Sequence, residues 1–380
     1  RACLIRADVI RQLGGPDPSF KTLMGASLEL GYRFIRYGAF VRHVPSLVST
    51  SNRSQVKVPM EDQWRFIKIH FGKQWQVWAG LRSVLLGKIE LFPLVKSLSA
   101  TRHCQSSEIW KPYQHFKHPA NAKIVSAKIS VLIPTVNRYP YLRKLLGQLR
   151  TQTKDAFEII VVDQTPKLDR DVTIPQDFAD LPLIYITVEK AGQCSSRNLG
   201  IKNSKGDWII FLDDDIEVSK DFIATYIKNL NDYRSKVMSG VIYEKNFAEL
   251  SSDFQFVRIS NVFPGGNSIL AKSVLFKTGL FDLAYDQGQR ADHDLGMRLY
   301  LAGEMLVLIP SIALLHHHAP MGGLREHKAR VKTYAASRAQ LFNFNLPTGS
   351  DLYLNKRYFS PEQLREQTWI SLIGTLSNRG

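Results

Sequence analysis

The chain has 380 residues, of which 44% are hydrophobic and 22% charged, and its net charge is +16 at pH 7. This length allows two or three domains, and this composition excludes a disordered chain. No uninterrupted apolar run reaches the ~20 residues of a membrane span, and the three scattered cysteines predict a reducing cytosol without disulfides.

The positive charge is concentrated near the beginning of the chain. Residues 1–127 hold 19 Lys and Arg against 7 Asp and Glu, which is a net charge of +12, whereas the remainder carries +4. A basic segment attracts anionic partners such as phospholipid, nucleic acid or a phosphorylated substrate. Because no nucleic-acid recognition motif is present, we expect no nucleic-acid partner. A contribution to solubility alone is the simplest alternative.

The first 50 residues resemble a later part of the same chain. They align without gaps with the segment that begins at residue 266, at a constant offset of 265. The identical pairs are Gly14 and Gly279, Asp17 and Asp282, Arg33 and Arg298, Gly38 and Gly303, Pro45 and Pro310, and Ser46 and Ser311. Such a repeat predicts that residues 1–55 are the C-terminal part of a first domain. It also predicts that the chain is a fragment of a longer tandem protein.

Residues 56–127 follow this first copy. Aromatic and aliphatic residues recur at helical spacing between positions 61 and 100, with Lys and Arg between them: Trp64, Ile67, Phe71, Trp75, Trp78, Leu81 and Leu85. Basic helices of this kind lie on membrane surfaces, so we expect residues 61–100 to make a peripheral membrane contact. A helical hairpin that packs on its own domain is the alternative. Residues 101–127 lack periodicity, which indicates a linker.

Strands and helices alternate from Lys128 onward. We expect strands at 129–134, 158–163, 183–188 and 208–212, and helices at 141–149 and 197–203. This order predicts a parallel α/β sheet, in which ligands bind beyond the carboxyl ends of the strands. Pro134, Thr135, Asp163 and the run Asp213–Asp215 fall at that edge.

The acidic run Asp213, Asp214 and Asp215 comes directly after an apolar strand. Three adjacent carboxylates repel one another unless a cation joins them. Hard oxygen ligands at this spacing suit Mg²⁺ or Mn²⁺ carrying a phosphate. A solvated acidic turn is the alternative.

Three histidines close a further predicted strand at 306–315. Strand alternation sends His316 and His318 to one side and His317 to the other. Imidazole is a ligand for divalent cations, so either His316 or His318 is a candidate metal ligand. An unrelated surface cluster is the alternative.

Six segments occur in an order that is specific when they are taken together. They are Ser130–Thr135, Val161–Asp163, Arg197–Ile201, Phe211–Asp215, Pro264–Asn267 and Ala291–Leu295. On these motifs residues 128–320 resemble a glycosyltransferase of family 2. The resemblance implies a GT-A domain at 128–345, with a mostly parallel sheet flanked by helices, followed by a helical tail at 346–380.

The resemblance also implies roles for individual residues on the donor side. Asp213 and Asp215 match the family's Asp-x-Asp motif, with Asp215 and His316 on the metal and Asp213 either at the ribose or reaching the metal through water. Asp163 matches a position that grips the nucleobase, although Gln164 stands where the family often has a second Asp. The other expected substrate-binding residues are Pro134, Thr135, Arg197, Asp214, Gly265, Gly266 and Asn267.

On the acceptor side, Asp292 matches the catalytic Asp of the family's Glu-Asp motif, with Ala291 in place of the usual Glu. We expect Asp292 just before a helix at 295–301, where it would act as the general base. A role only in capping that helix is the alternative. Asp294 is expected to cap the helix or to pair with a basic residue. In the first copy Ser27 and Ser51 replace Asp292 and His316, which favours a catalytically inactive scaffold.

The implied activity is that of an inverting, metal-dependent glycosyltransferase. It would move a sugar from a nucleotide-diphospho-sugar to a hydroxyl of a glycan or lipid-linked acceptor, in polysaccharide assembly in the cytoplasm at the inner membrane face. Two alternatives are a catalytically inactive nucleotide- or glycan-binding module and a nucleotidyltransferase. The latter needs a Gly-rich basic loop, which residues 133–139 do not provide.

Overall fold

The computed structural model describes residues 3–42, 44, 58–87, 94–95, 98–99, 101, 110–115, 128–244, 250–320, 322–323 and 347–377. The chain divides into two compact units. One comprises residues 1–115, 333–347 and 360–380, and the other comprises residues 116–332 and 348–359. We describe each unit by itself.

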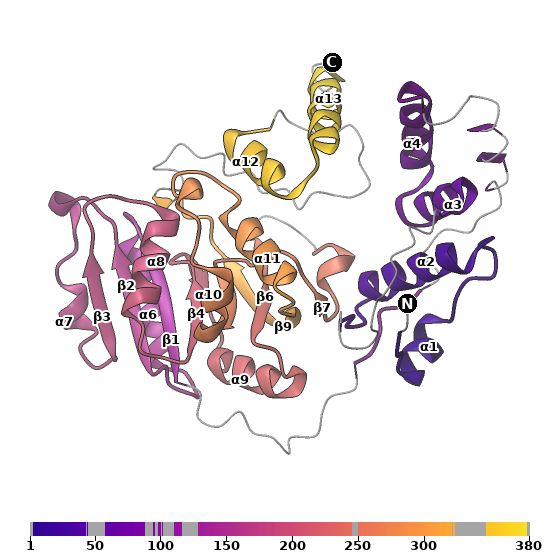
Figure 1. Cartoon of the computed structure of the whole chain (residues 1–380). Coiled ribbons are helices and arrows are strands. Elements are labelled where there is room, and N and C mark those ends of the chain that lie inside the picture. Colours follow the sequence, from indigo (N-terminus) through magenta and orange to yellow (C-terminus); the bar gives the residue numbers. More distant parts are fainter. Residues whose placement is uncertain are drawn as a thin grey trace. The chain divides into compact units, whose positions relative to one another are not determined.

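The second unit contains a nine-stranded mixed sheet with helices (Figure 1). Its strands are β1 (Ile129–Thr135), β2 (Glu158–Asp163), β3 (Leu183–Thr187), β4 (Trp208–Leu212), β5 (Ile216–Glu217), β6 (Val237–Glu244), β7 (Arg258–Ile259), β8 (Asn267–Ala271) and β9 (Leu306–His316). Its helices are α6 (Tyr139–Arg150), α7 (Ile174–Asp177), α8 (Gln193–Asn203), α9 (Phe222–Tyr233), α10 (Leu275–Thr278), α11 (Ala291–Leu301) and α12 (Gly349–Tyr358).

The strands are ordered β3-β2-β1-β4-β8-β6-β9-β5, and β7 pairs with β9. The pairs β2–β3, β1–β2, β1–β4 and β6–β9 are parallel, whereas β8 runs antiparallel to both β4 and β6. The predicted α/β class, with a mostly parallel sheet flanked by helices, is confirmed. The antiparallel strand β8 lies between the two parallel groups.

Strand direction decides which side chains meet at one edge of the sheet. Because β8 is antiparallel to β4 and β6 is antiparallel to β8, β6 runs in the same direction as β4. Strand β9 is parallel to β6, so its last residue, His316, ends at the same edge as Thr135 of β1 and Leu212 of β4. Strand β8 begins at this edge, where Asn267 pairs with Leu212.

The apolar runs of the sequence form the core on both faces of the sheet. On one face Leu132 and Phe211 pack in a cluster with Leu295 and Leu299 of α11. Helix α8 approaches strand β1 closely, because a Cβ on Gly200 would lie 1.8 Å from Leu132 Cδ1. Helix α6 buries leucines at the i, i+3, i+4, i+7 spacing of an amphipathic helix: Leu142, Leu145, Leu146 and Leu149.

Two of the predicted helices begin earlier than expected. Helix α8 starts at Gln193, four residues before the prediction, because the side chain of Asp286 accepts hydrogen bonds from the backbone N–H groups of Cys194 and Ser195 at its N-terminus. Helix α11 starts at Ala291, after Arg290 in a left-handed conformation (φ 81°). Asp292 therefore lies inside the first turn of α11 and not before the helix. It does not cap the helix.

The first unit is helical in the part that the structure describes. Its helices are α1 (Ala7–Leu13), α2 (Leu23–Arg36), α3 (Met60–Phe71), α4 (Lys73–Leu85) and α13 (Pro361–Ser377). Helix α3 packs on α2, since the carboxylate of Asp62 accepts the backbone N–H groups of Lys21 and Thr22 at the start of α2. This packing matches the alternative of a helical hairpin within its own domain.

The sequence repeat is also a repeat of contacts. In the first copy Arg33 pairs with Glu29 at 2.8 Å and donates to the carbonyl of Leu13. In the second copy Arg298 pairs with Asp294 at 2.8 Å and donates to the carbonyl of Thr278. All three partners are related by the offset of 265, and both carboxylates are at most 3% exposed.

The turns of the two copies correspond as well. Asp17 accepts the N–H of Ser19, and Asp282 accepts the N–H of Ala284. The paired glycines all have positive φ, at 77° and 76° for Gly14 and Gly279 and at 92° and 80° for Gly38 and Gly303. Left-handed backbone of this kind favours glycine, which explains why these identities recur. Pro45, Ser46 and Ser51 lie outside the described residues.

Replacing Arg33 by Met should strongly destabilise the first unit. Loss of one partner leaves the carboxylate of Glu29, 3% exposed, without its guanidinium, and breaking a buried ion pair typically costs about 3–5 kcal/mol. Hydrogen exchange of the α1 and α2 amides measures this loss, with the β1 and β4 amides as internal reference. Unchanged protection of α1 and α2 would show that the pair is dispensable.

Helix α4 exposes an apolar stripe on its own surface. Val77 is 44%, Leu81 51% and Leu85 82% exposed, each one turn apart. Within the described ranges, no helix combines the length and the apolar character that crossing a membrane requires. The predicted peripheral membrane contact of residues 61–100 stays a prediction, and residues 88–93 lie outside the described part of the chain.

Candidate functional site

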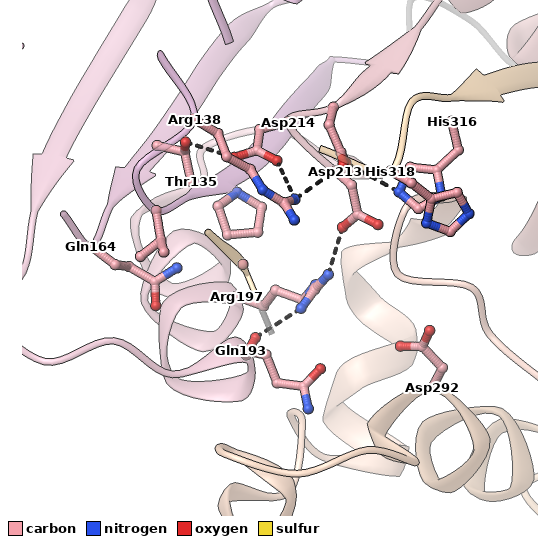
Figure 2. A pocket seen from close by; sticks show the side chains of 14 residues that line it. Thr135, Arg138, Gln164, Gln193, Arg197, Asp213, Asp214, Asp292, His316 and His318 are labelled. Carbon is pink, nitrogen blue, oxygen red and sulfur yellow. Dashed lines mark hydrogen bonds and ion pairs between the residues drawn. The ribbon is translucent and has the colours of Figure 1, made fainter. Parts of the chain in front are cut away.

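A cavity of about 180 Å³ opens at the sheet edge where β1, β4 and β9 end (Figure 2). It brings together eight of the residues predicted from the sequence: Pro134, Thr135, Arg197, Asp213, Asp214, Asp215, Asp292 and His316. Asp215 and Asp292 therefore face one shared space, as the prediction required. The other lining residues are Val136, Arg138, Gln164, Gln193, His318 and Gly323.

The acidic run forms a tight turn between β4 and β5, and its three carboxylates differ in environment. The side chain of Asp213 is 34% exposed, whereas those of Asp214 and Asp215 are 4% and 1% exposed. The hydroxyl of Thr135 donates to Asp214 Oδ2 at 2.7 Å, and the N–H of Ala319 donates to Asp215 Oδ2 at 2.9 Å. The turn is thus bonded to the ends of β1 and β9, and it is not a solvated loop.

Arg138 supplies positive charge to this turn, a role that the sequence reasoning missed. Its Nη1 lies 3.0 Å from Asp214 Oδ1 and 3.2 Å from Asp215 Oδ2. Asn137 before it adopts φ 54°, a left-handed conformation that Asn tolerates better than most residues. The sequence offered one indication that Arg138 belongs to the site, namely its position three residues after the end of β1. Only tertiary folding brings it to the carboxylates, 76 residues along the chain.

The three histidines divide as strand alternation predicts. The rings of His316 and His318 lie 4.2 Å apart and both line the cavity. His317 points elsewhere and contacts the carboxylate of Glu217. His316 Nε2 is 3.2 Å from Asp215 Oδ1. His316, one of the two candidates, thus contacts the predicted metal ligand Asp215.

Asp215 and His316 have the chemistry of a divalent-cation site. Burial opposes ionisation of Asp215, but the neighbouring His316 and Arg138 outweigh it and hold its pKa below the usual range. Asp215 Oδ1 is buried and makes no hydrogen bond within the described part of the chain. Among the described residues no group of three His, Cys, Asp or Glu is arranged to hold a metal. Two protein ligands fit a cation that takes its remaining ligands from phosphate and water.

Asp292 lines the cavity from the first turn of α11. Burial raises the pKa of its carboxyl to about 6, partly offset by the charge of Arg197. A Cβ on Gly265 would lie 3.0 Å from Asp292 Oδ1 and 3.1 Å from the Arg197 guanidinium. Any larger residue at position 265 would crowd both side chains. A carboxyl that titrates near neutral pH suits a general base.

Arg197 lies between the two sides of the cavity (Figure 2). Its Nη2 pairs with Asp213 Oδ1 at 2.9 Å, and its Nη1 donates to the carbonyl of Gln193 one turn earlier on α8. Its Nε is buried without a hydrogen bond in the described residues. The Arg197 side chain lines the cavity, where a guanidinium suits an anionic oxygen.

The substrate contact predicted for Asn267 does not agree with its position in the structure. It is fully buried, its amide nitrogen donates to the carbonyls of Val241 and Ile312, and its carbonyl accepts from the Tyr226 hydroxyl. Its hydrogen-bonding groups join β8 to the neighbouring strands, so it cannot contact a substrate. Gly265 and Gly266 lie behind the lining, where Gly266 leaves room for the Asp213 carboxylate.

Asp163 also lies outside the cavity lining. It is 1% exposed, and its carboxylate accepts the hydroxyls of Tyr139 and Tyr185 and the N–H of Thr165. These contacts fix the end of β2 and leave the next residue, Gln164, at the cavity. The direct contact with a nucleobase that was expected of Asp163 is therefore not supported by its placement, because its oxygens are already engaged.

Residues that the sequence reasoning missed include Gln193 and Gly323 besides Arg138. Gln193 begins α8 and holds the loop before α11, since its amide donates to the carbonyls of Tyr285 and Gly288. Gly323 has φ 60° and abuts the Arg138 guanidinium. Neither residue carries a signal of its own in the sequence, because both act through contacts made in the folded chain.

Residues 130–267 match the family model described as Glycosyl transferase family 2. The chain is 33% identical over 128 residues to "Glycosyltransferase GlyA" of Streptococcus pneumoniae, which covers 33% of this chain and 18% of that protein. It is 40% identical over 88 residues to an "Uncharacterized glycosyltransferase" of Haemophilus influenzae, covering 23% of this chain and 29% of that protein. The chain thus spans less than a third of the length of either relative.

The chain is also similar to a solved structure, the mannosyltransferase PcManGT of Pyrobaculum calidifontis in complex with GDP-Man and Mn²⁺. The TM-score is 0.45 at 18% identity, covering 64% of this chain and 68% of that one.

Proposed function

We propose that this chain, whose residues 130–267 belong to glycosyl transferase family 2, transfers a sugar from a nucleotide-diphospho-sugar to a hydroxyl of a glycan or lipid-linked acceptor. The observation that carries the proposal is the cavity in which Asp292 faces the acidic turn. One side offers the Arg197 guanidinium for a diphosphate and the Asp215 carboxylate for a cation, and the other side offers a carboxylate base.

The reaction we propose is a single in-line displacement with inversion. Asp292 takes the proton of the acceptor hydroxyl, whose oxygen bonds to the anomeric carbon as the bond between that carbon and the diphosphate oxygen breaks. The electron pair of the broken bond remains on the diphosphate. Arg197, whose side chain lines the cavity, donates to an oxygen of the departing group. Asp213, the most exposed of the three acidic residues, contacts the ribose.

Asp215 and His316 would hold a divalent cation, Mg²⁺ or Mn²⁺, since a carboxylate oxygen and an imidazole nitrogen lie next to each other there. When bound, the cation would neutralise the charge that develops on the diphosphate. His318 would support the ring of His316 from 4.2 Å.

Transfer should depend on pH through Asp292. Its pKa is raised from 3.8 to about 6, and only the ionised form accepts a proton. Below pH 6, kcat/KM should therefore fall about tenfold per pH unit. Nucleotide binding measured over the same pH range separates this effect from titration of the donor side. Constant kcat/KM down to pH 5 with constant nucleotide binding would show that the base is not a carboxyl group with a pKa near 6.

A donor assay separates the proposed enzyme from its alternatives. We expect slow hydrolysis of a matching nucleotide-sugar that depends on Mn²⁺, in a panel of such donors. A nucleotide- or glycan-binding module would bind a donor without turning it over. A nucleotidyltransferase would instead release pyrophosphate from a nucleoside triphosphate and a sugar phosphate.

Residues 1–55 are, we infer, a second copy of the acceptor-side segment without its base. Two sets of contacts that recur at the offset of 265 support this inference: those of Arg33 and Arg298 with backbone carbonyls, and those of Asp17 and Asp282 in the turns. Ser27 stands at the position of Asp292, and its hydroxyl donates to the carbonyl of Leu23 in the preceding turn. A hydroxyl so placed cannot replace a carboxylate base. The setting at the inner face of a cytoplasmic membrane, in polysaccharide assembly, remains a proposal that rests on family membership and on the basic helices.

A further inference from the structure

Arg138 is the one guanidinium in the described residues that contacts two members of the acidic turn. Its Nη1 bridges Asp214 and Asp215 at 3.0 and 3.2 Å, and its side chain is 11% exposed. Arg197 pairs with the partly exposed Asp213, whereas Arg138 offsets part of the negative charge of the two buried carboxylates. A buried carboxylate without a counter-charge is costly, so one positive charge is required here in the unliganded protein.

The same guanidinium is held on its other side by the loop after β9. Arg138 Nη2 donates to the carbonyl of Gly322 at 3.2 Å. Gly322 and Gly323 have φ of 73° and 60°. A Cβ on Gly322 would lie 2.1 Å from the Val136 carbonyl, and one on Gly323 would lie 2.7 Å from Arg138 Nη2. The loop therefore packs directly on Arg138, and the two glycines make that approach feasible.

The two carboxylate oxygens of Asp215 have different contacts. Oδ2 is engaged by Arg138 and by the N–H of Ala319. Oδ1 is buried, makes no hydrogen bond in the described residues and faces His316 at 3.2 Å. A cation that enters the turn can use Oδ1, but it must do so next to the positive charge of Arg138, which repels it.

We propose that Arg138 is a built-in counter-ion that weakens binding of a divalent cation to the free protein, so that the cation enters together with the diphosphate of the donor. This positioning role rests on the proposed function for the identity of the donor. The diphosphate brings negative charge that offsets the repulsion from Arg138, whereas the cation alone has no such partner.

Binding of Mn²⁺ alone, followed by its electron paramagnetic resonance signal, tests this proposal without any transfer assay. Arg138→Gln should bind Mn²⁺ about tenfold more tightly than the unchanged protein, since it lacks the repelling charge. Arg138→Lys keeps the charge and should bind Mn²⁺ as weakly as the unchanged protein. Arg143→Gln is the matched control, because it removes one Arg charge that pairs with Asp171 and Asp177 at the surface.

A purely structural Arg138 predicts a different pattern. Both Arg138→Gln and Arg138→Lys would then bind Mn²⁺ equally or less tightly, because neither side chain spans Asp214, Asp215 and Gly322 together. Equal or weaker Mn²⁺ binding by Arg138→Gln overturns the proposal. Tighter Mn²⁺ binding by Arg138→Lys also overturns it. If Arg138→Gln does not fold, Arg138→Met takes its place, and Mn²⁺ binding by that variant no tighter than that of the unchanged protein overturns the proposal. Absence of glycosyl transfer in the unchanged protein, with the Mn²⁺ pattern as expected, would refute the proposed function and leave the role of Arg138 intact.

Discussion

Replacing Asp292 by Asn should reduce sugar transfer by about 10²–10⁴-fold, the usual contribution of a general base. The amide is nearly isosteric with the carboxylate but cannot accept the proton of the acceptor hydroxyl. Because Asp292 lies across the cavity from the acidic turn (Figure 2), nucleotide affinity should change little. Transfer rates under saturating donor, together with nucleotide binding by calorimetry, measure both quantities.

Asp207→Asn is the matched control for this variant. Asp207 is exposed and directly precedes β4, at the opposite end of that strand from the acidic turn. Its transfer rate should equal that of the unchanged protein. Normal turnover by Asp292→Asn would refute the base assignment, and loss of nucleotide binding in that variant would place Asp292 on the donor side instead.

Replacing Asp215 by Asn should reduce kcat/KM by about 10²–10³-fold, as is typical when one preorganised group that stabilises leaving-group charge is removed. The reason is that Asp215 Oδ1, next to His316, is the anionic oxygen best placed to hold a cation. Binding of Mn²⁺ in the presence of a nucleoside diphosphate should be lost together with activity, and the same two measurements follow both effects.

Asp213→Asn distinguishes this loss from a general effect of the acidic turn. Asp213 pairs with Arg197 and its side chain is 34% exposed, so its replacement should weaken donor binding while the protein still binds Mn²⁺ with nucleotide. If Asp213→Asn abolishes Mn²⁺ binding and Asp215→Asn does not, the two roles are reversed. Circular dichroism of both variants checks that the buried turn has kept its fold.

Much of the fold could be predicted because local patterns in the sequence follow burial. The strand 208–212 was found at its observed limits, since a run of apolar residues that ends in carboxylates has only one plausible end. Helix ends were less predictable. Helix α11 starts at Ala291 and α8 at Gln193, and the α8 start depends on Asp286, which lies 91 and 92 residues away along the chain. Such distant contacts leave no local signal.

The candidate site divides in the same way. Asp215, Asp292 and His316 were predicted from the sequence because of their residue type and their place in a motif, and they line one cavity. Asp163 and Asn267 have equally suitable side chains, but these accept hydrogen bonds within the protein. The carboxylate of Asp163 accepts the hydroxyls of Tyr139 and Tyr185, and the amide oxygen of Asn267 accepts that of Tyr226. Whether a polar side chain faces a ligand or the interior depends on its neighbours in space.

The sequence by itself determined the α/β class, the acidic turn after β4 and the repeat at an offset of 265, because each is a property of neighbouring residues or of one alignment. Only the tertiary structure decided that β9 ends beside β4 and that Arg138 balances Asp214 and Asp215. The physical reason is that an antiparallel strand, β8, lies between the two parallel groups of strands. The direction of β9, and with it the position of His316, follows from pairings between distant strands and cannot be read from spacing along the chain.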